Sequence, residues 1–379
     1  MFDLSGQTVG TTGERLRIAQ IAPLANPVRR DIGSSIEHLI WLLTEELVRR
    51  GHEVTLFATG DSETSAELHA VYPRDYRHGF KEMGNWEFHE WLHVAAAFER
   101  SADFDIIHSH AYHAALPFTR VVEAPVVHTY HIVPDTDILN SYSRYPDAHL
   151  VAVSRYHRRK FKGIAEVPVV YNGVDLDAIP FNPRSGDYLL FLGHLIEKKG
   201  AVEAIQIARR AGMRLVMAGK GKGDYFDHEV KPLIDGRSIE HVGPVGIAQR
   251  NELLAGAGAL LFPITAAEPF GLVVAEAMAC GTPVAAFERC AVPELIESGV
   301  SGYYATGVED LAALVPATLR LDRSTVRQEA AIRFDHRRMV GDYESVYGQI
   351  LASRRGRERG EAHRIVAGAS RIDARGDTR

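Results

Sequence analysis

The stretch LRIAQIAPLANPVRRDIGSSIEHLIWLLTEELVRRGHEVTLFA, residues 16–58, changes its hydrophobic pattern twice. Residues 16–22 and 54–58 are short apolar runs of the kind that form buried strands. Between them, residues 36–50 repeat apolar side chains at helical spacing, and Gly51 stands where a glycine commonly ends a helix. A strand, a helix and a second strand in this order predict a parallel βαβ unit.

The same alternation continues along the chain and then starts again. Short apolar runs predict strands at residues 104–107, 126–130, 150–153 and 168–171, and in the second half at residues 188–192, 214–218, 238–242, 259–262 and 283–287. The segments VRRGHEVTLFATG, from Val48, and ARRAGMRLVMAGKG, from Ala208, share a helix end, a glycine stop, a strand and a glycine loop. The chain is therefore predicted to be α/β, with two doubly wound parallel-sheet domains and a cleft between them.

Composition narrows the class of protein. The 379 residues suit two or three domains, and 43 basic against 49 acidic residues give a net charge of −6, which argues against a nucleic-acid partner. Two cysteines are too few for a disulfide scaffold. Residues 1–14 lack the basic and apolar segments of a signal peptide, and no apolar run is long enough for a membrane span. We therefore expect a cytoplasmic protein with a flexible N-terminus over residues 1–14.

The domain boundaries are predicted from polar segments. Residues 177–187 are polar and contain two prolines and a glycine, so they predict a linker between domains at residues 15–180 and 181–335. Residues 353–379 carry eight arginines and four acidic residues with little apolar content, which predicts a disordered basic tail. Residues 155–162 are basic with two aromatics. Contact with anionic lipid stays open there, but a solvated helix face is the favoured interpretation.

In open α/β sheets, ligands bind beyond the carboxyl ends of the strands, so the loops after the strands are the places where a ligand site is expected. Residues 193–200, GHLIEKKG, place Lys199 at a helix start, where an ammonium and free amides suit a diphosphate; a solvated turn is the simpler alternative. Residues 265–283 enter an apolar helix, predicted at residues 272–279, that contains Glu276. A buried carboxylate needs a partner, either ligand hydroxyls or an arginine of the protein. The backbone amides of Gly271 and Leu272 suit phosphate.

Three further loops carry weaker signals. His131 ends the strand at residues 126–130 and is expected to face the cleft, although a lone histidine is more often structural. His108, His110 and His113 raise the question of a metal, but the companion Cys, Asp or Glu ligands are missing, so no metal site is predicted. Small residues at Gly33, Ser34 and Ser35 would let a ligand approach the backbone closely.

Together these segments resemble glycosyltransferase family 4. Residues 268–276, EPFGLVVAE, are similar to the E-x7-E signature of that family, and YNGVD (residues 171–175) and GHLIEKKG are similar to two of its loops. DIIHSH (residues 105–110) and PVVHTYH (residues 125–131) are similar to strands of its N-terminal domain. The resemblance covers about residues 16–350. It implies the GT-B fold, in which two Rossmann-like domains face each other, with a last helix at residues 336–352 crossing back to the first domain.

The resemblance also implies roles for individual residues. The reaction would be a metal-independent, anomer-retaining transfer of a hexose from a UDP- or GDP-sugar, with no cofactor, to a carbohydrate, lipid-linked or small-molecule acceptor. Glu268, His131 and Lys199 would act at the sugar and diphosphate, and Glu276 would bind the ribose. The remaining donor contacts would come from Gly193, His194, Val242, Gly243, Val245, Phe270, Gly271 and Leu272. Gly33, Ser34 and Ser35 would form the phosphate and acceptor loop.

Two departures from the family pattern bear on activity. His194 stands where the family usually has an arginine, so one fixed positive charge at the phosphates is in question, and Arg29, Arg30 and Lys220 are the candidates to replace it. Ser34 and Ser35 replace a usual glycine pair, so a catalytically weak sugar- or nucleotide-binding homologue stays open. A nucleotide-sugar 2-epimerase and a sugar phosphorylase use the same fold and remain alternatives. A two-lobed sugar-binding protein without catalysis would normally be exported, and the lack of a signal peptide argues against that class. An NAD-dependent dehydrogenase would need a G-x-G-x-x-G loop after the first strand, and this loop is missing.

Overall fold

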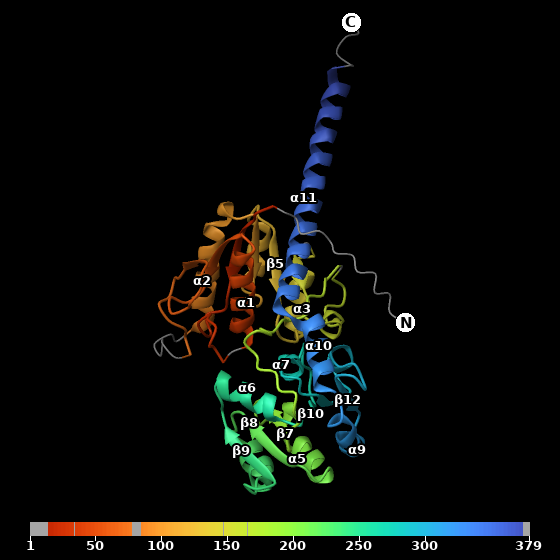
Figure 1. Ribbon diagram of the computed structural model, residues 1–379. Coiled ribbons are helices and arrows are strands. Elements are labelled where there is room, and N and C mark those ends of the chain that lie inside the picture. Colours follow the sequence, from red (N-terminus) through yellow and green to blue (C-terminus); the bar gives the residue numbers. More distant parts are fainter. Residues whose placement is uncertain (1–13, 34, 78–84, 147, 165, 374–379) are drawn as a thin grey trace.

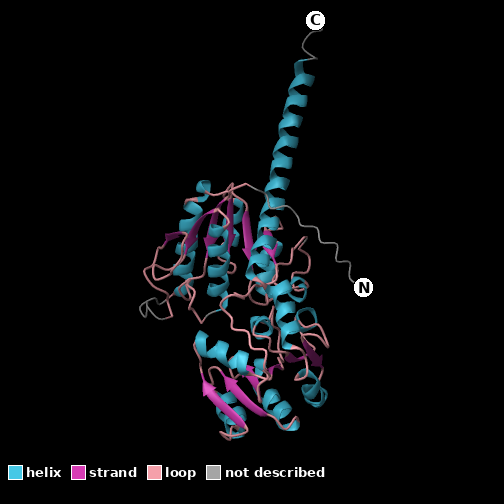
Figure 2. Ribbon diagram, in the orientation of Figure 1, coloured by secondary structure: helices cyan, strands magenta, loops and turns pink. Residues whose placement is uncertain are grey.

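The computed structural model describes residues 14–33, 35–77, 85–146, 148–164 and 166–373. They form two α/β domains, one above the other in Figures 1 and 2, each with a six-stranded parallel sheet and helices on its faces. The prediction of two doubly wound parallel sheets is confirmed. The expected flexible N-terminus lies outside the described residues, apart from Glu14.

The two sheets have the same topology. The first sheet has the order β3-β2-β1-β4-β5-β6, and the second has the order β12-β11-β10-β7-β8-β9. When the strands of the second sheet are numbered from one and read from β9, its order is also 3-2-1-4-5-6. Each sheet therefore has a point where the strand order reverses, between β1 and β4 and between β7 and β10. Loops diverge at such a point and leave a crevice for a ligand.

The strands of the first sheet are β1 (Arg17–Ile21), β2 (Glu53–Phe57), β3 (Glu67–His69), β4 (Ile106–Ser109), β5 (Val126–Thr129) and β6 (His149–Val151). Those of the second are β7 (Tyr188–Leu192), β8 (Arg214–Ala218), β9 (Ile239–Gly243), β10 (Ala259–Phe262), β11 (Val284–Phe287) and β12 (Gly302–Ala305). The predicted strand at 168–171 forms only a single bridge, Val169 to Ala152. Pro168 begins this run and has no N–H to donate to a ladder.

The α-helices are α1 (Ser35–Arg49), α2 (Trp86–Glu99), α3 (Thr136–Ser143), α4 (Arg155–Arg158), α5 (Ala201–Arg210), α6 (Ile247–Gly256), α7 (Leu272–Ala279), α8 (Val292–Leu295), α9 (Val308–Thr318), α10 (Arg323–Phe334) and α11 (His336–Asp373). Gly51 and Gly212 end α1 and α5 with positive φ angles of 92° and 65°. A glycine adopts this conformation without the clash that a Cβ would cause.

Helix α11 crosses back from the second domain to the first (Figure 1). It packs beside α1, and Met339, Tyr343 and Tyr347 complete the core that also contains Leu39 and Leu43 of α1. Burial of each such side chain contributes about 1.5–3 kcal/mol, which explains why the last helix belongs to the first domain.

The C-terminal segment corrects a prediction. The sequence predicted a disordered tail over residues 353–379, but α11 continues as a helix to Asp373, and residues 374–379 lie outside the described part. Residues 353–373 contain three glycines but no proline, and eleven of these 21 residues are arginine, alanine or glutamate. These residues have high helix propensity, so a composition that looks disordered also extends a helix already begun by packing. Within the described residues, none of the helices combines the length and the apolar character needed to cross a bilayer.

Candidate active site in the interdomain cleft

A cavity of about 600 Å³ opens between the two domains at the carboxyl ends of both sheets. The first domain contributes the loops after β1 and β5, with Gly33 and His131 on the wall. The second contributes the loops after β7, β8, β9 and β10, which supply Gly193, His194, Lys199, Gly219, Lys220, Pro244, Val245 and residues 268–273, together with Arg250 and Glu276. The cavity thus brings together most of the residues that the sequence singled out.

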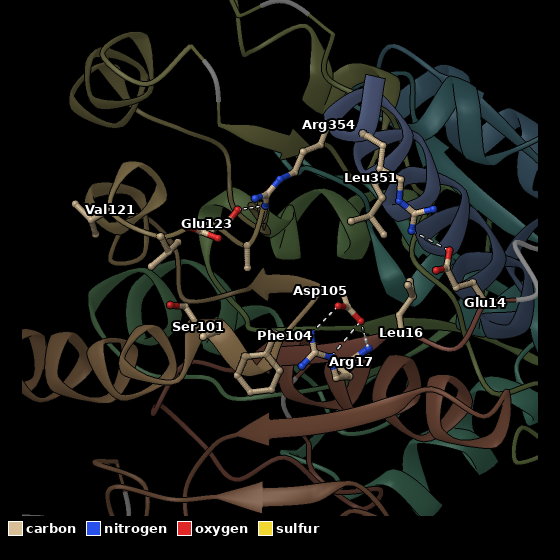
Figure 3. A pocket seen from close by; sticks show the side chains of 14 residues that line it. Glu14, Leu16, Arg17, Ser101, Phe104, Asp105, Val121, Glu123, Leu351 and Arg354 are labelled. Atoms are coloured by element: carbon tan, nitrogen blue, oxygen red, sulfur yellow. Dashed lines mark hydrogen bonds and ion pairs between the residues drawn. The ribbon is translucent and has the colours of Figure 1, made fainter. Parts of the chain in front are cut away.

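A second cavity, of about 660 Å³, lies at the amino ends of the first sheet (Figure 3). Two ion pairs lie on its wall: Arg17 pairs with Asp105 at 2.8 Å, and Arg355 pairs with Glu14 at 2.9 Å. None of the residues predicted from the sequence lines it. Ligands of doubly wound sheets bind at the carboxyl ends, so the interdomain cavity is the candidate site.

The loop after β10 builds one wall of the cavity. Gly271 is the N-cap of α7 with φ +98°, and within the described residues no side chain caps this helix end. The amides of the first turn are therefore available to an anion. Phe270 is buried and packs the turn against the hydrophobic core of the second domain. Leu272 and Val273 border the cavity.

Lys199 and Glu268 meet across two loops of the second domain. The Lys199 ammonium donates to Oε2 of Glu268, and the two side chains are 35% and 22% exposed. The loops are held together because Thr265 N donates to the carbonyl oxygen of Lys198 at 3.2 Å. Gly200 has φ +76°, and a Cβ there would lie 1.9 Å from the carbonyl oxygen of Pro263. Only glycine allows this close approach, which sets Lys199 beside Glu268.

Glu276 has a protein partner. Its Oε1 lies 2.9 Å from Nη1 of Arg250 on α6, and the Glu276 side chain is 13% exposed. The sequence left the partner open between ligand hydroxyls and an arginine; the structure supplies the arginine, while Glu276 still faces the cavity. Arg250 was not among the predicted site residues. It stands singly in a polar helix, and no local pattern marks it.

His131 lies at the end of a buried polar chain. Its Nε2 is 3.0 Å from Nδ1 of His110, whose Nε2 is 3.0 Å from Oε1 of Gln20. Burial lowers the pKa of His131 to about 3 and that of His110 well below its usual value, so both rings are neutral at pH 7. The Gln20 oxygen accepts from His110, whose Nδ1 therefore accepts from His131. His131 is left with Nδ1 as a hydrogen-bond acceptor.

Some predicted residues lie elsewhere. Val242 and Gly243 belong to β9 and do not line the cavity, because the strand continues to Gly243, whose carbonyl oxygen accepts from Gly219 N at 2.8 Å. Ser34 lies outside the described residues, and Ser35 is the first residue of α1. The rings of His108 and His110 are tilted by 39° with centroids 4.1 Å apart, yet among the described residues no group of three or more His, Cys, Asp or Glu is placed to hold a metal ion.

Comparison with known proteins finds relatives for both halves of the chain. Residues 36–178 match the family model described as Glycosyltransferase Family 4, and residues 186–323 match the model described as Glycosyl transferases group 1. A phosphatidyl-myo-inositol mannosyltransferase of Mycobacterium leprae is 25% identical over 89% of this chain and 98% of its own length. A D-inositol 3-phosphate glycosyltransferase of Mycobacterium avium is 26% identical over 90% and 97%.

Solved structures agree on the fold. AviGT4, a glycosyltransferase involved in avilamycin A biosynthesis, matches 89% of this chain and 98% of its own, with 25% identity and a TM-score of 0.66. The sucrose-phosphate synthase of Thermosynechococcus elongatus covers 89% of this chain and all of its own at 17% identity, with a TM-score of 0.71. The expected GT-B fold is confirmed, and the chain is a hexosyltransferase that belongs to glycosyltransferase family 4.

Proposed function

We propose that the protein transfers a hexose from a UDP- or GDP-sugar to an acceptor hydroxyl, without a metal and with retention of the anomeric configuration. The observation that carries the proposal is the placement of Lys199, Glu268 and the uncapped start of α7 on one wall of the cavity, with His131 and Gly33 from the other domain on the opposite wall. A nucleotide sugar held by the second domain would meet an acceptor held by the first.

The wall around α7 suits the leaving group. Departure of a nucleoside diphosphate leaves negative charge on the phosphates, which fixed dipoles and cations stabilise. The amides at Gly271 and Leu272 and the Lys199 ammonium supply such groups. In the proposed reaction the bond between the anomeric carbon and the phosphate oxygen breaks, and the acceptor oxygen bonds to that carbon on the same face. A phosphate oxygen takes the acceptor proton, so no protein base is needed.

The carboxylates would hold the rest of the donor. Glu268 would accept hydrogen bonds from sugar hydroxyls beside the Lys199 ammonium with which it pairs. Glu276 would accept from the ribose hydroxyls, which would share its oxygens with Arg250. The bare Nδ1 of neutral His131 would accept a hydroxyl of the sugar near the reacting carbon.

The donor and acceptor classes have indirect support. The Anabaena protein HepE, solved with UDP-glucose, matches 89% of this chain with a TM-score of 0.65 at 18% identity, and two curated relatives are named for inositol-containing acceptors. A carbohydrate, lipid-linked or small-molecule acceptor would therefore suit the first domain. The proposal places the reaction in the cytoplasm and includes neither nucleic acid nor a stable membrane contact.

A two-step experiment tests the proposal. Thermal shifts with UDP, GDP, ADP and their sugars come first, and one nucleotide should raise the melting temperature. NMR of the product formed with the matching sugar donor then reads the anomeric configuration, with and without EDTA. Retention that survives EDTA supports the proposal, and inversion or abolition by EDTA contradicts the mechanism. A changed sugar nucleotide without any acceptor would indicate an epimerase, and no shift with any nucleotide would remove the basis of the proposal.

A further inference from the structure

The charged side chains on the cavity wall do not all neutralise one another. The wall carries three permanent cations, Lys199, Lys220 and Arg250, and two carboxylates, Glu268 and Glu276. Lys199 is paired with Glu268, and Arg250 is paired with Glu276. Lys220 is the cation of this wall that has no carboxylate partner among the described residues.

The backbone holds Lys220 next to the Gly193–His194 turn. The carbonyl oxygen of Lys220 accepts from Leu195 N at 3.0 Å. Gly219 has φ +145°, and a Cβ on it would lie 1.9 Å from the carbonyl oxygen of Gly193. The two loops are therefore in contact through backbone atoms that only a glycine permits. The position of Lys220 on the wall follows from this contact and not from a flexible surface loop.

The charge balance of the cavity wall indicates which kind of ligand Lys220 suits. A diphosphate brings several negative charges into a partly desolvated cavity, and each needs a cation or a hydrogen-bond donor. The two ion pairs offer little net charge, because each cation already faces a carboxylate. Lys220 lines the cavity and is exposed, and no carboxylate among the described residues of this wall offsets its charge. His194, beside it, is not a permanent cation.

We propose that Lys220 binds the diphosphate of the nucleotide donor as a second cation beside Lys199. This inference rests on the proposed function, since it names the group that recognises the leaving phosphate. It assigns to the loop after β8 the charge that the residue at position 194 lacks. Lys222 lies in the same glycine-rich loop, two residues on, and is exposed outside the cavity. It provides a matched control.

The test measures binding with and without phosphate on the ligand. Whichever of UDP, GDP and ADP the wild-type protein binds is titrated by calorimetry against Lys220→Met, Lys220→Arg and Lys222→Met, together with the corresponding nucleoside. Lys220→Met should weaken diphosphate binding about 10- to 100-fold, which is typical of a lost hydrogen bond to a charged group. Nucleoside binding should not change, Lys220→Arg should restore most of the diphosphate affinity, and Lys222→Met should match wild type.

The outcomes separate this inference from the proposed function. Equal diphosphate affinity in Lys220→Met and wild type overturns the role of Lys220 and leaves the proposed function standing. Equal weakening in Lys220→Met and Lys222→Met also overturns it, because the effect would then be the general charge of the loop. A wild-type protein that binds none of the nucleotides contradicts the proposed function, and the inference falls with it.

Discussion

The hydroxyl oxygen of Tyr347, on the last helix, lies 2.7 Å from Nδ1 of His108 on β4, although 239 positions separate the two residues. Both side chains are buried. The same hydroxyl oxygen accepts from Nε2 of Gln20 at 3.4 Å, and the amide oxygen Oε1 of Gln20 accepts from His110. The contact therefore links α11 to the chain of hydrogen bonds that ends at His131 in the cavity.

Replacement of Tyr347 by phenylalanine should lower activity through His131. Without the phenol oxygen, the Gln20 amide loses the contact that sets its orientation, and the tautomers of His110 and His131 are no longer determined. We expect kcat to fall about tenfold with little change in donor KM, and stability to fall by about 1 kcal/mol for the lost hydrogen bond. Steady-state kinetics and urea unfolding measure the two effects.

The matched control for this prediction is Tyr343→Phe. Tyr343 lies on the same helix face, and its hydroxyl is 3.0 Å from Oγ1 of Thr129, so its loss costs a comparable hydrogen bond. Among the described residues, its hydroxyl forms no hydrogen bond with Gln20 or His110. Equal kcat values in the two variants would show that helix packing, and not the chain to His131, accounts for the effect.

The Arg250–Glu276 pair allows the ribose role of Glu276 to be separated from a structural role. Glu276→Gln should weaken nucleoside binding about tenfold or more, because an amide replaces a charged acceptor of ribose hydroxyls. Calorimetry with the nucleoside measures this loss. The double variant Arg250→Met, Glu276→Gln removes the whole ion pair. If it binds the nucleoside as well as wild type does, Glu276 serves only to neutralise Arg250.

Gly33 should limit how closely a ligand approaches the first domain. A Cβ at Gly33 would meet no protein atom within 4 Å, and the residue lines the cavity. Gly33→Ala should therefore leave the melting temperature within about 2 °C of wild type while it weakens binding of the sugar nucleotide. Gly307→Ala, at another position with open space and remote from the cavity, is the control. Unchanged donor affinity in Gly33→Ala would remove that loop from the donor site.

The first domain should lose stability as the pH falls below about 6.5. Burial lowers the pKa of a set of histidines, to about 4 for His93 and His157, to about 3 for His128 and His131, and well below the usual value for His108 and His110. Between pH 6.5 and 4 the unfolded chain binds protons that the folded chain does not. Each histidine therefore removes up to about 1.4 kcal/mol of unfolding free energy per pH unit in that window.

Two carboxyl groups act in the opposite direction, because burial raises the pKa of Glu90 to about 7 and also raises the pKa of Asp342. The contribution of Glu90 to stability therefore grows as the pH falls from 7 toward 4. The six histidines outweigh these two groups. Urea unfolding at pH 7, 6 and 5 measures the net slope, and His128→Gln should give a shallower slope by up to one proton. A free energy of unfolding that rises on acidification contradicts the prediction.

The sequence indicated the elements of the second domain closely. The predicted strands at residues 188–192, 214–218 and 259–262 coincide with β7, β8 and β10, and the predicted helix at residues 272–279 coincides with α7. These elements are apolar because both faces of a parallel sheet are covered, and such runs are visible without knowledge of partners. The weaker strands β3 and β12 escaped prediction, since both are short edge strands with half-buried residues.

What the sequence determined alone is local: where strands and helices lie, which loops follow the carboxyl ends, and that Lys199, Glu268 and Glu276 stand in such loops. Only the tertiary structure decided which side chains contact one another across the fold. Arg250 became the partner of Glu276, Tyr347 came to orient the chain to His131, and Lys220 remained the cation without a carboxylate. Strand order and domain packing set these distances between residues far apart in the chain, and hydrophobic periodicity reports only which face of each element is buried.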